Sequence, residues 1–354
     1  MRARETGVAE VPLAWVGPVK VGDETSGMGG WAWEGAVPLA TYETPLWASV
    51  ERGAHATARA GGLRCVVQDD RMARSVMVEA PDAAGAADAA RWLEAHQDEL
   101  RAVAEGTSRH AKLLAVRTET AGRLLYARIE CATGEASGHN MVTRAADAVL
   151  GWFLERRPEC RYGSISGNWC CDKKVSAVNG LMGRGKRVTA EAVLERRLVE
   201  RYLHTTPEKI ERLCWGKNWV GSALAGSVRS ANAHAANMLL AFYLATGQDA
   251  ANIVEGSQCF TLAETTEDGG LRFSCTLPSL VMGTVGNGKG LPGVEAALKR
   301  LDCAREGVED GANARQLARL CAATVLCGEL SLLAAEANPG ELMAAHLRME
   351  RSQE

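Results

Sequence analysis

The densest group of residues that could do chemistry lies in SISGNWCCDKKVSAVNGLMGRGK, residues 164–186. Here Lys173 and Lys174 follow an aspartate in a stretch rich in Gly, Asn and Ser, with little helical or strand periodicity. Such a stretch predicts a loop that presents cations. A run of charges is as often a solvated surface, so spacing alone leaves both interpretations open. The GRGK at its end lacks the G-x-x-x-x-G-K-[ST] spacing of a phosphate-binding P-loop.

A second group lies in residues 217–252, where His234 and Asn237 are one turn apart near the start of an expected helix. Free backbone amides at a helix N-terminus favour anions, although a histidine in this place is more often capped or exposed than catalytic. Upstream, Glu43 stands among apolar neighbours in PLATYETPLWASVERG. Apolar surroundings raise the pKa of a carboxyl, so we expect Glu43 to suit proton donation near neutrality.

Two hydrophobic cores are expected, because 354 residues exceed the roughly 100 to 150 that one core ordinarily holds. Between residues 74 and 165 the periodicity alternates in the order βαββαβ, which is the split βαβ of ferredoxin-like domains. The expected elements are a strand at 74–80, a helix at 88–104, strands at 111–119 and 123–132 joined as a hairpin, a helix at 140–156 and a strand at 160–165.

The remainder is more helical. Apolar stripes at helical spacing occupy residues 190–204, 232–246 and 314–337. We therefore predict an α+β protein in which a larger, helix-rich domain, residues 1–73 and 166–354, carries an inserted small ferredoxin-like domain, residues 74–165.

Composition excludes several classes of protein. A chain with 47% hydrophobic residues is not disordered, and a net charge of −3 without a basic block argues against a nucleic-acid partner. Eleven cysteines, including the adjacent Cys170 and Cys171 and no C-x-x-C spacing, favour reduced thiols in the cytoplasm over disulfides or a metal site. No signal-peptide pattern and no run of about 20 apolar residues is visible, so no membrane anchor is expected.

Several segments together resemble 3-hydroxy-3-methylglutaryl-CoA (HMG-CoA) reductase. SGNWCCDKKVSAVNGLMGRGK is similar to the family's SGNxCxDKKxxAxNxxxGRGK, and GSALAGS, NAHAAN and ATGQD follow in the family's order. LPSLVMGTVGNG resembles its MPSxxxGTVGGG loop, and ATYETPLWASVERG stands where the family has ATTEGxLVASxNRG. The resemblance covers residues 10–349, and the segment GQDAANIV is more similar to the class I enzymes than to class II.

The resemblance implies reduction of the HMG-CoA thioester to mevalonate, in isoprenoid supply, by two NADPH and without a metal. Lys173 matches the lysine that stabilises the oxyanion on the thioester carbonyl, where preorganised positive charge is commonly the largest catalytic effect. Glu43 matches the proton-donating glutamate. Asp249 matches the aspartate that tunes the network formed by this glutamate and the lysine. The residues matched to substrate binding are Arg74, Ser166, Lys174, Lys217 and Asn237, with Arg52 near the CoA.

The resemblance also places the dinucleotide on the small domain, where the family's motif reads DAMGMN and this chain has EASGHN, residues 135–140. Gly138 and Asn140 are kept, Glu135 is a conservative change, and His139 replaces a methionine. Further matches are Ser108 and Arg109 to the 2′-phosphate site, which favours NADPH over NADH, and Gly286 and Gly288 to the nicotinamide side. The family's active site forms across a dimer interface, so a homodimer or higher homo-oligomer is expected.

The tail departs from the family. The acid for the departing CoA thiolate is expected about five residues after the histidine matched by His346, and Arg351, or Glu350 with a one-residue slip, stands there. We expect a slowed or rerouted second step, in which Arg351 or His346 handles the thiolate, with His139 and His234 the next candidates.

Two smaller departures concern the acyl-CoA. Arg229 and Ser230 replace a glycine pair, and Glu51 replaces an asparagine beside the CoA. The alternative to the reductase is therefore a non-catalytic or substrate-shifted relative that binds another acyl-CoA or a dinucleotide.

Overall fold

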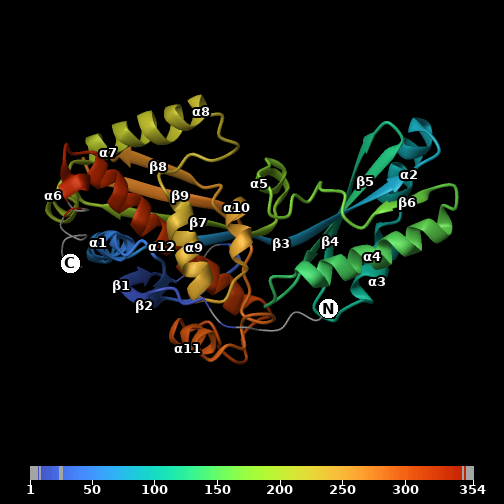
Figure 1. Ribbon diagram of the computed structural model, residues 1–354, viewed down its shortest axis with the longest axis horizontal. Helices are drawn as coiled ribbons and strands as arrows, with labels where there is room; N and C mark the ends of the chain where they lie inside the picture. The colour runs from blue at the N-terminus through green and yellow to red at the C-terminus, as the bar shows by residue number, and fades with distance from the viewer. Residues whose placement is uncertain (1–6, 8, 24–26, 345–346, 348–354) are drawn as a thin grey trace.

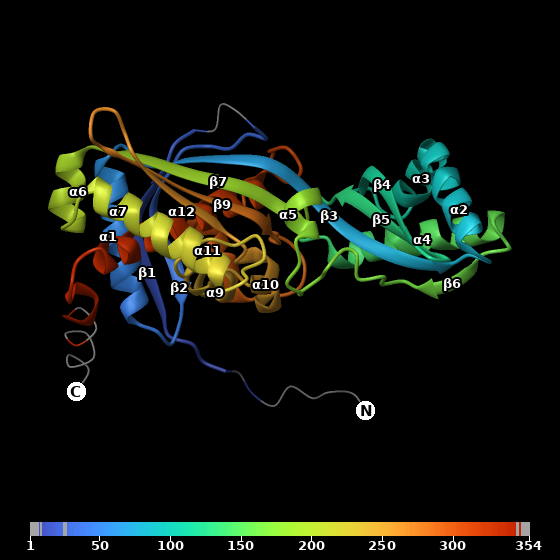
Figure 2. The ribbon, with the colours of Figure 1, turned by 90° about the horizontal axis from the view of Figure 1, so that it is seen from above.

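One long strand, β3 (Arg64–Glu79), runs through both lobes of the molecule (Figure 1 and Figure 2). Its first part pairs with β7 (Gly185–Leu194), and its second part pairs with β5 (Leu124–Ala132) and β6 (Arg161–Ser164). At about 3.3 Å per residue, its 16 residues span roughly 50 Å. The computed structural model describes residues 7, 9–23, 27–344 and 347.

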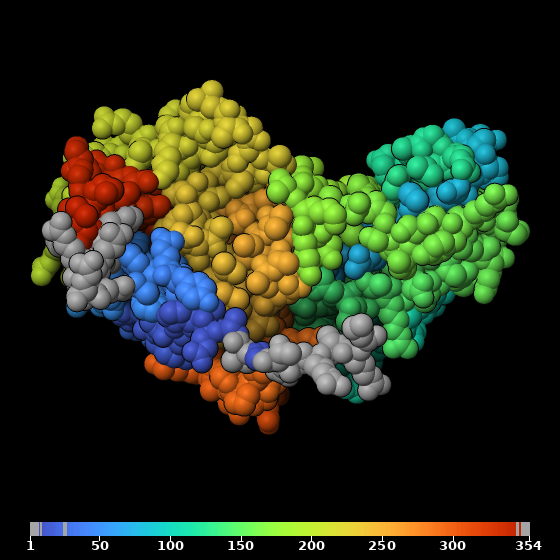
Figure 3. All heavy atoms as spheres, in the orientation of Figure 1, coloured from blue at the N-terminus to red at the C-terminus, as the bar shows by residue number. Residues whose placement is uncertain are grey.

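The expectation that this strand begins at Arg74, on the domain boundary, is wrong. Backbone pairing with β7 already starts at Arg64, so the strand passes through the boundary without a break. The narrower waist between the lobes in Figure 3 is therefore bridged by continuous strand as well as by the segment that returns after β6.

The larger lobe is built on the strand order β3-β7-β9-β8, with β8 at Phe260–Thr265 and β9 at Leu271–Leu280. The helix α12 (Ala312–Glu336) packs against β7 and β9, and α1 (Pro45–Arg59) and α9 (Ala235–Ala245) pack against α12. An antiparallel hairpin of β1 (Leu13–Val21) and β2 (Trp33–Ala40) covers α1 and α9. These layers enclose the larger of two hydrophobic cores.

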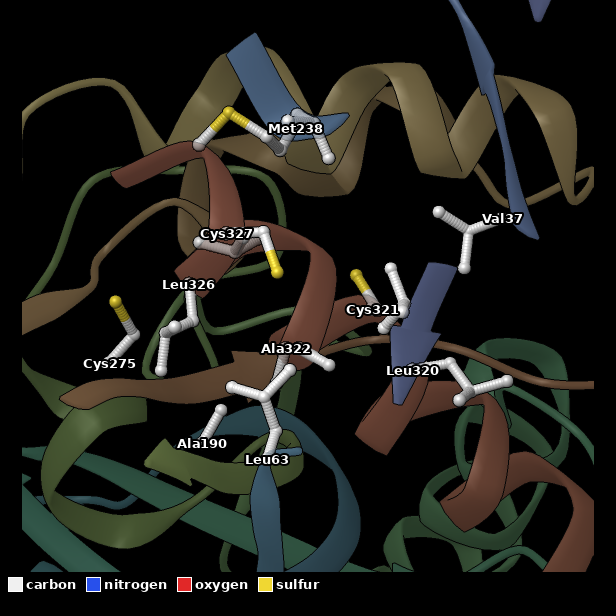
Figure 4. Packing of buried hydrophobic residues seen from close by; sticks show 14 of the residues in the cluster. Val37, Leu63, Ala190, Met238, Cys275, Leu320, Cys321, Ala322, Leu326 and Cys327 are labelled. Atoms are coloured by element: carbon white, nitrogen blue, oxygen red, sulfur yellow. The ribbon is translucent and has the colours of Figure 1, made fainter. Parts of the chain in front are cut away.

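The central helix α12 is buried on nearly all sides, as Figure 4 shows for Leu320, Cys321, Leu326 and Cys327. Within the described part of the chain it is the one helix long and apolar enough to cross a membrane, contrary to the expectation that no such run exists. However, 94% of its most apolar window is buried inside the protein. Its hydropathy is that of a core helix.

The larger lobe also contains eight shorter helical elements among the described residues. They are α5 (Val178–Met182), α6 (Arg196–Leu203), α7 (Pro207–Leu213), the π-helix η1 (Cys214–Gly221), α8 (Ser222–Leu224), the 3-10 helix η2 (Ala250–Asn252), α10 (Ile253–Gly256) and α11 (Pro292–Arg300). The helix expected at 190–204 is wrong in its first part, because residues 185–194 form β7. Both edges of that segment are paired, with β3 and β9, and these hydrogen bonds override its local helical pattern.

The smaller lobe has the strand order β4-β5-β3-β6, with β4 at Lys112–Ala121. Against it pack α2 (Ala83–Ala95), α3 (Gln97–Glu105) and α4 (His139–Arg156), which enclose the second core. The single helix expected at 88–104 is broken at His96, whose ring stacks on Trp92 with 3.9 Å between centroids. The expected hairpin between β4 and β5 is present, with Gly122 at φ 57° in the turn.

Candidate active site

The loop that carries the paired lysines is fastened to the smaller lobe by a buried arginine. Arg128 of β5 is fully buried and donates to the carbonyl oxygens of Trp169 at 2.9 Å and of Gly183 at 2.6 Å. Its Nε donates to Glu130, which is also fully buried, at 2.9 Å. Near the start of the loop, the amide of Gly167 donates to the carbonyl of Ser75 on β3 at 2.7 Å. The loop is thus held at both ends.

Lys173 and Asp249 form an ion pair across this loop. The Lys173 Nζ donates to Asp249 Oδ2 at 2.6 Å, although the two residues are 76 positions apart. Because of this bond, the pKa of Lys173 lies above its ordinary value. Burial alone would raise the pKa of Asp249, but the bonds from Lys173 and from the Ala251 amide outweigh it and hold that pKa below its usual range. The pair is therefore charged at neutral pH.

Next to this pair, Asp172 is the centre of a charged cluster. Its carboxylate accepts from the buried Arg184 at 2.8 Å, and Arg74 lies 3.9 Å away. The other contacts of Asp172 are Asn252 at 3.4 Å and the Nε2 of His139 at 3.6 Å. Burial disfavours the charged carboxylate, but its cationic neighbours prevail, and the pKa of Asp172 is well below its ordinary value.

Glu255 anchors the same cluster from α10. It is fully buried, accepts from Arg184 at 2.8 Å and from Asn252 at 2.8 Å, and also faces the Lys173 amide at 3.4 Å. Burial raises its pKa, and the positive charge of Arg184 opposes that shift. The sequence reasoning missed Asp172, Arg184 and Glu255 as site residues. Their only signal was position, because Asp172 adjoins the paired lysines and Arg184 lies in the GRGK segment.

Glu43 lies in a different place, at the start of α1. It lines a cavity of about 360 Å³ together with Arg52, His234, Asn237 and Glu336. Apolar residues such as Leu46 and Leu332 line this cavity with Glu43, but the Glu43 side chain itself is exposed, so burial does not enclose its carboxyl. Its backbone carbonyl accepts from the Leu46 amide at 3.0 Å, in the turn that starts α1.

The residues matched to substrate binding divide between these two places. Arg52 is held by Ser331 at 3.0 Å and Glu341 at 2.9 Å, and Lys217 forms an ion pair with Glu336 of the cavity wall. At the lysine loop, Lys174 donates to the backbone carbonyl of Asp172 at 3.0 Å. The remaining members are Asn237 in the cavity, and Arg74 and the exposed Ser166 by the lysine loop.

One chain therefore does not bring all the matched catalytic residues together. Among the described residues, no hydrogen bond or ion pair joins Glu43 to Lys173 or Asp249. His346, Arg351 and Glu350 lie outside the described residues.

The two segments matched to the dinucleotide lie side by side. Ala136 and Val285 form a parallel bridge, and the Thr284 amide donates to the Glu135 carbonyl at 2.8 Å. A Cβ on Gly283 would overlap the backbone of Ser137, so only glycine permits this approach. Glycines with left-handed φ lie on both segments, namely Gly138 (89°), Gly286 (100°) and Gly288 (83°).

The carboxylate of Glu135 has a structural partner. Its two oxygens accept from the amides of Asn313 at 2.9 Å and Ala314 at 2.8 Å, in the first turn of α12. A carboxylate at a helix N-terminus is favourable for both the free amides and the helix dipole. This side chain therefore ties the smaller lobe to the central helix, which the match to a cofactor motif did not indicate.

The residues around the start of α4 fit a phosphate-bearing ligand. Its first turn contains no acidic residue, and Gly138 brings the chain into the helix in a left-handed conformation. Helix N-termini approached by glycine-rich backbone are suited to phosphates. Arg109 is exposed, and its Nε donates to His110 at 2.9 Å, while His110 contacts Asp310 at 3.1 Å. Ser108 is half-buried beside it, and Asn140 is exposed in the first turn of α4.

Comparison with known proteins assigns a family to this geometry. The model for hydroxymethylglutaryl-coenzyme A reductase matches residues 4–351. The 3-hydroxy-3-methylglutaryl-coenzyme A reductase of Pyrococcus horikoshii is 45% identical over 347 residues, 98% of this chain and 82% of that protein. The reductase of Aeropyrum pernix is 41% identical over 342 residues, 96% of this chain and 79% of that protein.

Solved structures agree on the fold. The 3-hydroxy-3-methylglutaryl-coenzyme A reductase of Streptococcus pneumoniae has a TM-score of 0.74 at 20% identity, over 94% of this chain and 86% of that chain. A class II reductase from the same organism, bound to NADPH in open conformations, has a TM-score of 0.73 at 21% identity, with 94% and 86% covered.

Proposed function

The chain belongs to the hydroxymethylglutaryl-coenzyme A reductase family, and we propose that it reduces the thioester of HMG-CoA to the alcohol mevalonate in two hydride transfers from NADPH. The observation that carries this proposal is the charged pair of Lys173 and Asp249, whose side chains are 2.6 Å apart. The loop that carries Lys173 lies beside the start of α4. That pair places a fixed ammonium where a carbonyl oxygen can be stabilised while it gains negative charge.

In this mechanism Lys173 binds the thioester oxygen, and Asp249 orients the ammonium. Glu43 supplies a proton to the reduced carbonyl oxygen from a second copy of the chain. Arg74, Ser166 and Lys174 on one copy, with Lys217, Asn237 and Arg52 on the other, hold the carboxylate, the hydroxyl and the CoA. Each of these groups binds or orients the substrate. Those whose interactions strengthen in the transition state raise kcat, and those that bind the substrate equally well throughout lower KM.

NADPH, when bound, supplies the hydride for each step. We place it at the start of α4, with Gly138, Asn140 and the backbone around Glu135 on one side and Gly286 and Gly288 on the other. Ser108 and Arg109 would hold the 2′-phosphate, because a guanidinium is fork-shaped and permanently charged. The glycine-only approach of residues 135–138 to residues 283–288 supports this placement.

The proposal includes a homodimer or larger homo-oligomer. Exposed apolar side chains gather beside the lysine loop, namely Val175, Leu181, Leu224 and Val228, of which Leu224 is 85% exposed. Contacts from Gln258 to the carbonyls of Ser176 and Val228 hold the two segments together. Clusters of exposed apolar residues commonly mark protein interfaces. We propose that a second copy docks on this face and supplies its Glu43 to the Lys173 loop.

We also propose a large domain at residues 1–73 and 166–354 and a ferredoxin-like dinucleotide domain at residues 74–165. The strand order β4-β5-β3-β6 and the separate core of the smaller lobe support these boundaries. A cytoplasmic location is supported by the eleven free cysteines, since reducing compartments keep thiols unpaired.

Lys173→Ala tests the function. With HMG-CoA as substrate, NADPH oxidation followed by absorbance should fall about 10²- to 10³-fold in kcat, with a smaller change in KM, because the charge acts on the transition state. The exposed Lys299 provides a matched control, and Lys299→Ala should keep wild-type kinetics. A wild-type protein that binds CoA or NADPH but never consumes NADPH would instead establish the non-catalytic relative.

A further inference from the structure

His139 stands between the proposed dinucleotide site and the loop that carries Lys173. It is the first residue of α4, directly after the left-handed Gly138, and a Cβ on Gly138 would overlap the side chain of Thr133. The turn is therefore fixed, and it directs the imidazole away from the core of the smaller lobe. The Nε2 lies 3.6 Å from Asp172 Oδ1, beside the loop held by Arg128 and Arg184.

The Nε2 of His139 is buried and has no hydrogen-bond partner among the described residues. The 3.6 Å to Asp172 is beyond a hydrogen bond. On the other side of the ring, Nδ1 lies 3.5 Å from the Ser137 hydroxyl. A buried polar atom without a partner is uncommon and costly, so an unpaired Nε2 beside the Lys173 loop indicates a ligand atom as its partner.

The other histidine in the site does not have this freedom. His234 Nε2 contacts the Gly328 carbonyl at 3.0 Å, and its Nδ1 lies 3.4 Å from the Asn237 amide nitrogen. Both ring nitrogens are therefore engaged. Of the two, His139 is the one with a ring nitrogen left for a substrate atom.

The charges that surround His139 nearly cancel. The anions are Asp172 on the lysine loop, Asp249 before η2 and Glu255 on α10; the cations are Arg74 on β3, Arg184 before β7 and Lys173 on the lysine loop. With three of these groups of each sign, neither sign dominates around the imidazole. Imidazole is also the side chain whose ordinary pKa lies nearest neutrality.

From this geometry we propose that His139 is a further catalytic residue, whose Nε2 proton goes to the sulfur of coenzyme A when the thioester half of the reaction ends. The inference rests on the proposed function. After the first hydride transfer the substrate is a thiohemiacetal. Its C–S bond breaks and the electron pair leaves on sulfur, which takes the Nε2 proton. The hydroxyl proton passes to a site carboxylate as the C=O bond forms, so charge and atoms balance.

The sulfur is within reach of such an acid for a chemical reason. Sulfur and the oxygen stabilised by Lys173 are bonded to the same carbon. An acid beside the loop of Asp172 and Lys173 is therefore near both the departing sulfur and the oxygen that gains negative charge. In this chain the family's tail histidine is replaced by Arg351, and the family's methionine at position 139 is replaced by histidine, so the acid has moved from the tail to the start of α4.

The test compares two substrates in the full-length enzyme. His139→Met should slow reduction of HMG-CoA about 10²-fold, the lower end of general-acid effects, and leave reduction of free mevaldehyde unchanged, because only the thioester expels a thiolate. His139→Gln keeps a hydrogen-bond donor but no transferable proton, so it should behave like His139→Met. The exposed His204 provides the control, and His204→Gln should leave both rates unchanged.

The pH profile gives a second readout. An acid must hold its proton, so the wild-type thioester rate should decline at alkaline pH, and this decline should disappear in His139→Met. Equal loss with both substrates, full activity in His139→Gln, or an unchanged ratio of the two rates would overturn the inference. Loss of NADPH binding in His139→Met, measured by fluorescence, would also overturn it by showing a structural role. A wild type inactive with both substrates would instead contradict the proposed function.

Discussion

Arg184→Met should weaken both the fold and the site, because this arginine neutralises two carboxylates in the interior. Its side chain is fully buried and lies 2.8 Å from Glu255 and 2.8 Å from Asp172. Removing one partner of a buried pair typically costs about 3–5 kcal/mol, since the remaining charge is left without compensation. The equilibrium constant for unfolding should therefore rise roughly 10²- to 10⁴-fold.

The penalty should also depend on pH. Burial raises the pKa of Glu255, and Arg184 opposes that shift, so Arg184→Met raises this pKa further. A carboxyl whose folded pKa exceeds its unfolded value loses stability as the pH rises through the folded pKa. For Asp172, whose pKa is lowered, the stability that Arg184 supplies is present above the unfolded pKa and is lost on acidification. Only the Glu255 effect falls between pH 5 and pH 7.5, because the Asp172 carboxyl titrates below this range, so the penalty should be larger at pH 7.5 than at pH 5.

Urea unfolding followed by circular dichroism at these two pH values measures the effect. Arg187→Met is the matched control, because Arg187 is only partly buried and bonds to Gln68 at 3.2 Å. Arg184→Met/Glu255→Gln should recover part of the loss, since the double variant leaves less buried charge. A free energy of unfolding for Arg184→Met within about 0.5 kcal/mol of wild type would refute this reasoning. So would a loss of stability that does not become smaller on acidification.

Two further outcomes follow from the site. Arg109→Ala should raise the KM for NADPH much more than for NADH, and an equal rise for both would show that the guanidinium does not contact the 2′-phosphate. Sedimentation velocity at micromolar concentration should give at least a dimer, and Leu224→Glu on the exposed apolar face should produce monomers with little activity; a fully active monomer would contradict the shared site.

Much of the fold and site was accessible from local sequence. The periodicities of β4, β5, α4, α9 and α12 predicted those elements, because a strand or amphipathic helix is encoded in the spacing of its own apolar residues. The resemblance placed Lys173, Asp249 and Glu43 in one reaction. The charged residues within the strand that became β5, Arg128 and Glu130, were not singled out, although two opposite charges at positions i and i+2 of an apolar strand fall on one buried face.

The sequence by itself determined the family, the residues that match the family's reaction and most element types, since these depend on residue identity and near neighbours. Tertiary structure decided how they meet. Residues 185–194 became a strand only because β3 and β9 pair with both of their edges, and β3 crosses both lobes because it finds partners along its whole length. The bond between Lys173 and Asp249, the Asp172 cluster and the separation of Glu43 from both depend on contacts between residues far apart in the chain. Such contacts are fixed by sheet register and buried charge, which local spacing does not specify.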